Sequence, residues 1–128
     1  MLKVTKFGGS SMADAGQYRK IKDIVKSDPE RRVVVVSAAG KRTSDDHKIT
    51  DLLYLCYAHV QYGVACDTIF EMIASRYLQI RDELKITMDL ESEFAQLKQR
   101  LDAKTISQDE LVSRGEYFSA KLMAAYLG

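Results

Sequence analysis

A pair of glycines directly after a short alternating segment constrains the fold of this chain more than any other feature. Residues 2–7 alternate in side-chain character, which predicts a β-strand. Gly8 and Gly9 then predict a turn, because residues without a Cβ atom make tight turns easily. A helical pattern of apolar residues begins at Tyr18, and we expect the two serines after the glycines to cap this helix. The sequence therefore predicts a strand, a glycine turn and a helix in direct succession.

This arrangement is suited to binding an anion. At the start of a helix, unpaired backbone N–H groups and the positive end of the helix dipole point to one place, which favours a phosphate group. Lys6, at the end of the predicted strand, would add a full positive charge there. The alternative is an ordinary strand-to-helix turn beside a solvated lysine, because the glycine spacing matches neither the P-loop nor the dinucleotide-binding motif.

A second strand is predicted over residues 32–37, which include four consecutive valines. A strand without polar alternation is expected to be buried on both faces, as in a parallel sheet that helices cover. Asp28 and Pro29 help to end the helix between the two strands, so the first third of the chain predicts a right-handed βαβ unit. Both strands would then end at the same edge of the sheet, where open α/β sheets bind their ligands.

Helices are predicted after the second strand. Residues 39–48 are almost entirely polar and predict a loop, and Thr50 is expected to cap the helix that follows and ends at Gly63. Two amphipathic helices, starting near Asp67 and Leu90, then predict a helical insertion over about residues 64–106. The sequence does not define the role of this insertion.

Two capping boxes lie close together near the C-terminal end. Residues 107–110 and 113–116 both have a serine followed three residues later by glutamate, which is typical of a helix start. They predict either two short helices or one bent helix over the last twenty residues.

The composition is typical of one small soluble domain. The chain has 128 residues, 46% of them hydrophobic and 29% charged, and a formal net charge of +1. Interspersed charges offer no basic face for nucleic acid, and no apolar run is long enough to cross a membrane. Since no secretory signal precedes the first strand, we expect a cytoplasmic protein. Cys56 and Cys66 lack metal-ligand and redox spacing, which indicates buried, idle thiols.

Several segments of the chain resemble aspartokinases, in the order in which that family carries them. They are Lys6–Ser11, Val33–Ala38 with Thr50–Leu53, and Ser113–Glu116 followed by Leu122–Leu127. The resemblance covers the whole chain. It implies an α/β fold of the three-layer αβα amino-acid-kinase (carbamate-kinase-like) type, present here as its N-terminal portion and carrying the helical insertion.

The resemblance also implies an activity, with ATP and Mg²⁺ as expected cofactors. Aspartokinases transfer the γ-phosphoryl group of ATP to the β-carboxylate of L-aspartate, the entry step towards lysine, threonine and methionine. Two alternatives remain open. One is another amino-acid kinase of the superfamily, acting on glutamate or its N-acetyl derivative, and the other is a non-catalytic module that binds an amino acid or a partner chain.

The site residues that the resemblance implies fall into two groups. Lys6 is expected to be catalytic, contacting the transferring phosphoryl oxygens, while Gly8, Gly9 and Ser10 offer backbone and hydroxyl donors to phosphate. The second group is expected to bind aspartate and comprises Ser37, Ala38, Thr50 and Glu116.

Glu116 has two alternative roles. As a substrate ligand it would receive the α-ammonium group of aspartate, whereas as the last residue of a capping box it would bond to the backbone N–H of Ser113. Three residues stay without an assigned role. Lys41 is the one charge of the polar loop that is of possible interest, whereas His47 and His59 have no spacing partner for metal binding or acid–base chemistry.

The aspartokinase catalytic domain continues well beyond 128 residues. We therefore expect residues 1–128 to be the N-terminal part of such a domain, with the nucleotide-binding half and the regulatory domains outside it. The parent enzyme is expected to be a homo-oligomer. On its own, this segment is expected to be inactive, to hold neither ATP nor Mg²⁺, and to self-associate through its open strand edge.

Overall fold

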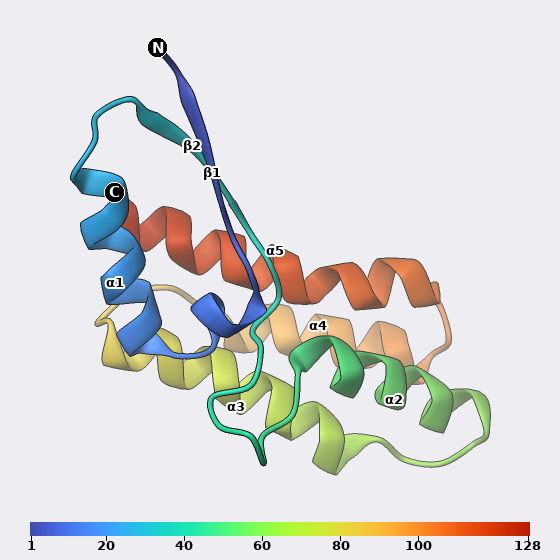
Figure 1. The fold of residues 1–128 in the computed structure, drawn as a ribbon. Helices are drawn as coiled ribbons and strands as arrows, with labels where there is room; N and C mark the ends of the chain where they lie inside the picture. Colours follow the sequence, from blue (N-terminus) through green and yellow to red (C-terminus); the bar gives the residue numbers. More distant parts are fainter.

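A pair of parallel strands forms the N-terminal part of the fold (Figure 1), in a computed structural model that describes residues 1–128. Strand β1 (Lys3–Phe7) is connected to β2 (Arg31–Val36) by helix α1 (Ala15–Lys26). The register places Phe7 beside Val36 at the C-terminal ends of the two strands. The predicted βαβ unit is therefore confirmed, and both strands end at the same edge.

The entry into α1 differs from the prediction. A short 3-10 helix, η1 (Gly9–Met12), follows the first glycine, and α1 starts only after it. Asp14 caps α1, because its carboxylate accepts a hydrogen bond of 3.0 Å from the backbone N–H of Gln17. The expected serine cap was wrong, since the extra turn buries Met12 and moves the start of α1 away from the serines.

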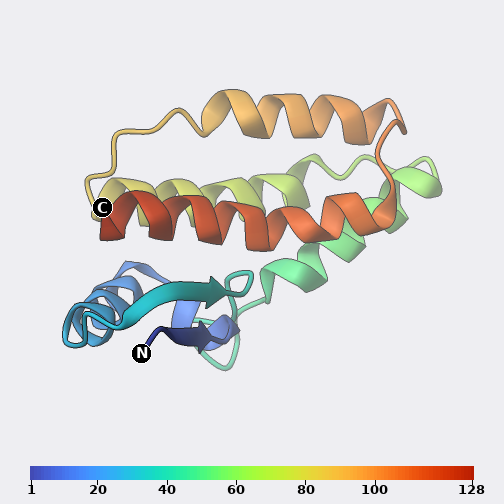
Figure 2. The ribbon, with the colours of Figure 1, turned by 90° about the horizontal axis from the view of Figure 1, so that it is seen from above.

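Four helices make up the rest of the chain: α2 (Ile49–Gln61), α3 (Asp67–Glu83), α4 (Glu91–Asp102) and α5 (Gln108–Leu127). Helices α3 and α4 confirm the two predicted amphipathic helices. Gly63, which follows α2, has the positive φ of 73° that suits glycine at a helix end. Figure 2 shows the strand pair and α1 on one side of α5, with α4 on the other side. None of the helices has the length and apolar character needed to span a membrane.

Two expectations about where helices begin near the predicted site are corrected by the structure. Lys48 occupies the cap position of α2 without a side-chain bond, so Thr50 lies in the first turn and is not the cap. Helix α5 is continuous from Gln108, and its Ser107 cap accepts a bond of 3.1 Å from the backbone N–H of Glu110. The second capping box therefore does not form, and the Ser113 hydroxyl donates to the Glu110 carbonyl instead.

Only one face of β2 is covered. Val34 and Val36 pack against the hydrophobic core, whereas Val33 and Val35 are 40% and 43% exposed. The expectation that both faces of β2 would be buried was wrong for residues 1–128, in which only the face that carries Val34 and Val36 is covered. The core centres instead on aromatic rings from α3, α4 and α5, in which Phe94 and Phe118 stack at 4.3 Å between centroids.

Both cysteines lie in this core as free thiols, as predicted. Burial raises the pKa of Cys56 to about 12, so its thiol stays protonated at neutral pH.

Helix α5 approaches the end of β2 unusually closely at Gly115. A Cβ atom at this position would lie 2.7 Å from the Cβ of Ala38 and 3.4 Å from Cδ1 of Leu53. Glycine has a low helix propensity, but at this position it lets α5 pack against the segment that follows β2.

We predict that Gly115→Ala lowers the free energy of unfolding by about 1–3 kcal/mol, because the added methyl group overlaps Ala38. Gly16→Ala is a matched control on α1, where the new Cβ would meet only Asp14 at an ordinary 3.4 Å. Because alanine has a higher helix propensity than glycine, Gly16→Ala should raise the free energy of unfolding by up to about 1 kcal/mol. Chemical denaturation measures the free energy of unfolding of both variants. If Gly115→Ala were as stable as the wild-type protein, the close approach at Gly115 would not be required.

Candidate functional site

Two loops at the C-terminal ends of the strands meet through their backbones. The N–H of Gly40, after β2, donates a hydrogen bond of 2.8 Å to the carbonyl oxygen of Gly9, after β1. A Cβ atom at Gly40 would lie 2.5 Å from the Gly9 carbonyl carbon, so only glycine allows this contact. The sheet edge predicted to bind a ligand is thereby built from both strand ends.

A pocket of about 550 Å³ opens at this edge. Six of the eight predicted site residues line it: Gly9, Ser10, Ser37, Ala38, Thr50 and Glu116. They come from η1, the segment after β2, the first turn of α2 and the middle of α5. The fold thus brings together residues more than 100 positions apart in the sequence.

Lys6 and Gly8 do not line this pocket. Lys6 is exposed on β1, beside Val35 in the strand register, and Gly8 is exposed at the start of η1. Val35 is also exposed, so Lys6 lies on the face of the strand pair that the helices leave open. In the chain, Lys6 lies three residues before Gly9, which lines the pocket.

Four lining residues had not been assigned to the site from the sequence. Lys41 and Lys48 are exposed and bring positive charge to the rim, while Ala39 and Gly40 are buried. Lys41 had been left unassigned, and Lys48 carries no local signal beyond preceding α2. Gly40 could have been found from its place shortly after a predicted strand, since glycine often marks a close backbone approach.

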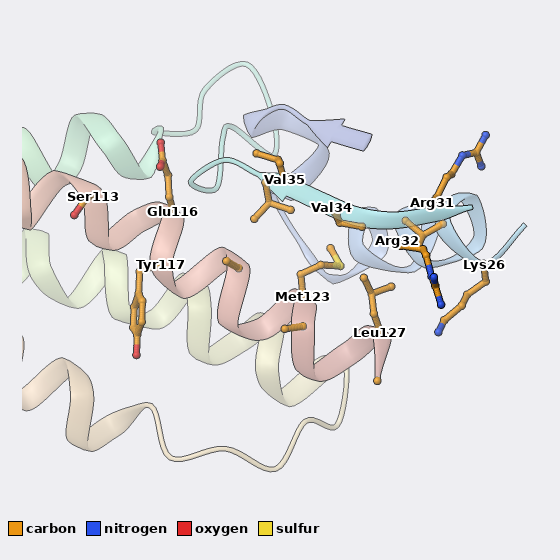
Figure 3. Close-up of a pocket in the computed structure, with 15 residues that line it drawn as sticks. Lys26, Arg31, Arg32, Val34, Val35, Ser113, Glu116, Tyr117, Met123 and Leu127 are labelled. Carbon is orange, nitrogen blue, oxygen red and sulfur yellow. The ribbon is translucent and has the colours of Figure 1, made fainter. Parts of the chain in front are cut away.

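Glu116 is free to face a ligand. It is exposed in the interior of α5, where the backbone N–H of Ser113 already lies within the helix, so the capping alternative is excluded. Figure 3 shows its carboxylate on the opposite side of α5 from the Tyr117 ring. Tyr117 points towards α4 and donates a hydrogen bond of 2.6 Å to Glu93.

A second and larger pocket, of about 780 Å³, lies between β2 and α5 (Figure 3). Its walls include Val34 and Met123, and basic side chains of Arg31 and Arg32 stand at one end. Glu116 is the only predicted site residue in its lining. The predicted chemistry therefore gathers in the smaller pocket, which Glu116 joins to this apolar groove.

The smaller pocket offers donors for anionic groups. Two lysine side chains and three hydroxyl groups supply hydrogen-bond donors, and Glu116 supplies one carboxylate for a cation. Nowhere in the chain do three His, Cys, Asp or Glu side chains gather as ligands for a metal ion.

Comparison with known proteins identifies the family of this chain. The model of the amino acid kinase family matches residues 1–128. The chain belongs to this family. Aspartokinase 3 of Bacillus subtilis is 38% identical over 98% of this chain and 29% of its own length. Chloroplastic aspartokinase 1 of Arabidopsis thaliana is 32% identical, over 97% of this chain and 23% of its own length.

Solved structures of this amino acid kinase family show the same fold. Aspartate kinase of Clostridium acetobutylicum matches with a TM-score of 0.92 and 48% identity, over 97% of this chain and 28% of its own. E. coli aspartokinase III, in complex with aspartate and ADP, matches with a TM-score of 0.77 and 29% identity, over 99% of this chain and 29% of its own. The α/β amino-acid-kinase fold and the likeness to the N-terminal portion of aspartokinases are confirmed. The chain spans less than a third of the length of these relatives.

Proposed function

We propose that residues 1–128 form the N-terminal part of the catalytic domain of an aspartate kinase. The observation that carries this proposal is the pocket in which Ser37, Ala38, Thr50 and Glu116 meet, although they come from separate segments of the chain. A relative with the same fold, E. coli aspartokinase III, has been crystallised with aspartate and ADP.

The pocket suits the charges of aspartate. An amino acid with two carboxylates and one ammonium group needs donors at two places and an acceptor at a third. Hydroxyl groups of Ser37 and Thr50, with the ammonium groups of Lys41 and Lys48, supply donors for carboxylates. Glu116 supplies the acceptor for the α-ammonium group.

Lys6 and the glycine turn would act on the phosphoryl group. The attacking carboxylate and the transferred phosphoryl group are both anionic, so catalysis requires positioning them in line and neutralising their charge. ATP with Mg²⁺ supplies the phosphoryl group when bound. Lys6 would bring a positive charge from the strand that leads into the glycine turn, and Gly8, Gly9 and Ser10 would offer donors for phosphate oxygens.

The domain organisation follows from the same proposal. Residues 64–106 form a helical insertion in the kinase domain, and the nucleotide-binding half and regulatory domains belong to other parts of the complete protein. The chain covers 28% of the Clostridium enzyme, so residues 1–128 alone would lack most of the ATP site. We expect this segment alone to be inactive and to show no saturable ATP binding.

Turnover by the complete protein tests this function. With ATP and Mg²⁺, we expect ADP to form when L-aspartate is added and not when glutamate or N-acetylglutamate replaces it. Preference for either of these compounds would assign the chain to another amino-acid kinase. Binding of aspartate by calorimetry without any turnover would favour a non-catalytic module.

Lys6→Met in the complete protein should reduce kcat by about 100-fold or more, with a smaller effect on the KM for aspartate. A cation aimed at developing charge acts mainly in the transition state. Lys3→Met is the matched control on β1, where Lys3 pairs with Asp28 at 2.6 Å, far from the pocket. Its kcat should be normal. A Lys6→Met enzyme with normal kcat and only a raised KM would remove Lys6 from the catalytic role.

Glu116→Gln should weaken aspartate binding by about 1.5–3 kcal/mol, because a charge-assisted hydrogen bond to the ammonium group is lost. Its free energy of unfolding should stay within about 0.5 kcal/mol, since Glu116 is exposed. Asp109→Asn removes another exposed carboxylate of α5, outside the pocket, and should bind aspartate normally. Calorimetry measures the affinity for aspartate. Equal affinities in the wild-type protein, Glu116→Gln and Asp109→Asn would contradict the role of Glu116 in binding the ammonium group.

A further inference from the structure

Helix α3 does not line the aspartate pocket, yet it places two adjacent polar residues directly behind it. Arg76 and Tyr77 are 4% and 0% exposed, respectively. Buried polar groups of this kind destabilise a fold unless they are hydrogen-bonded. Both side chains find their partners in segments that carry lining residues of the pocket.

The Tyr77 hydroxyl joins the two walls of the pocket. It accepts a hydrogen bond of 3.1 Å from the backbone N–H of Ala39 and donates one of 2.8 Å to the carbonyl oxygen of Gly115. Ala39 follows Ala38, and Gly115 precedes Glu116. One hydroxyl group therefore fixes the segment after β2 relative to the turn of α5 that presents Glu116.

The Arg76 guanidinium holds the loop that forms the third wall. It donates to the carbonyl oxygens of Gly40 at 2.7 Å and His47 at 3.0 Å, and to a carboxylate oxygen of Asp46 at 2.8 Å. It also reaches the carbonyl oxygen of Ala13 at 3.4 Å. The two ends of the 40–48 loop, which carries Lys41 and Lys48, are thus tied to one buried side chain.

Asp46 links Arg76 to a second arginine of the same loop, and we call this set of bonds around the 40–48 loop the loop clamp. Its carboxylate also accepts hydrogen bonds from the backbone N–H and the guanidinium of Arg42, at 2.9 and 2.7 Å. The bond from Arg42 holds the pKa of Asp46 well below its usual range, so the carboxylate stays charged between the two arginines.

We propose that Arg76 and Tyr77 are positioning residues for the aspartate site, Tyr77 setting the distance between Ala38 and Glu116 and Arg76 fixing the loop of Lys41 and Lys48. The inference rests on the proposed function for the identity of the ligand. It gives the helical insertion a role in substrate binding, although none of its residues touches the pocket.

Tyr77→Phe in the complete protein is the principal test. The ring keeps its packing against Phe94 and Phe118, while the backbone groups of Ala39 and Gly115 lose their shared partner. The KM for aspartate should rise about 10-fold, the KM for ATP should stay within about 2-fold, and hydrogen exchange at the Ala39 amide should accelerate.

Tyr18→Phe is the matched control. Tyr18 is also fully buried and its hydroxyl donates to the carbonyl oxygen of Ser119 at 3.4 Å, but no hydrogen bond joins it to Ala39 or Gly115. This variant should lower Tm without changing the KM for aspartate. If both variants lower Tm and neither changes KM, Tyr77 is only a structural residue and the proposal fails.

Arg76→Met tests the loop clamp, with Arg76→Lys as the conservative variant. Amides of residues 40–48 should exchange faster in Arg76→Met, the KM for aspartate should rise at least 10-fold, and Arg76→Lys should recover part of both losses. Arg81→Met removes another arginine of α3, which pairs with Glu91 away from the pocket, and should change neither measurement.

These measurements separate the two proposals. A wild-type protein that does not turn over aspartate would reject the proposed function, while hydrogen exchange would still report whether Arg76 and Tyr77 hold the pocket walls. A wild-type protein that turns over aspartate, combined with normal KM values in Tyr77→Phe and Arg76→Met, would reject the positioning role alone.

Discussion

The pocket depends on two glycines that approach their neighbours more closely than any residue with a side chain could. Gly40 donates its N–H to Gly9, which joins the ends of the two strands. Gly115 brings α5 against Ala38. Because a Cβ at either position would overlap its neighbour, the shape of the pocket is set by the backbone. These contacts fix the backbone segments from which Ser37, Thr50 and Glu116 reach the pocket.

Close backbone approach also creates a need for buried hydrogen-bond partners. The N–H of Ala39 and the carbonyl oxygen of Gly40 lie in the interior, where an unpaired group would cost about 1–3 kcal/mol. Tyr77 and Arg76 satisfy these groups from α3. The βαβ unit and the helical insertion are therefore coupled through polar contacts as well as through the aromatic core. A change in the insertion would reach the pocket by this route without any contact with a ligand.

The sequence predicted the features that depend on local pattern. Strands, the βαβ connection, α3 and α4 follow from periodicity and glycine placement, and six of the eight predicted site residues meet in one pocket. The failures involve competition between neighbouring signals or distant packing. Asp14 rather than serine caps α1, and Ser113 heads a capping pattern that a continuous α5 overrides. The roles of Arg76 and Tyr77 depend on partners some 30 to 40 residues away, so no local pattern could have indicated them.

The proposed function requires some residues to hold aspartate and others to act on the phosphoryl group. Aspartate would be held by its α-groups, while its β-carboxylate stays free to attack. Glu116 and the hydroxyl groups lie inside the pocket, whereas Lys6 stands on the open face of the strand pair, next to the glycine turn. Under the proposed function, a phosphoryl group held at the glycine turn would lie near Lys6 without displacing any group that holds the amino acid.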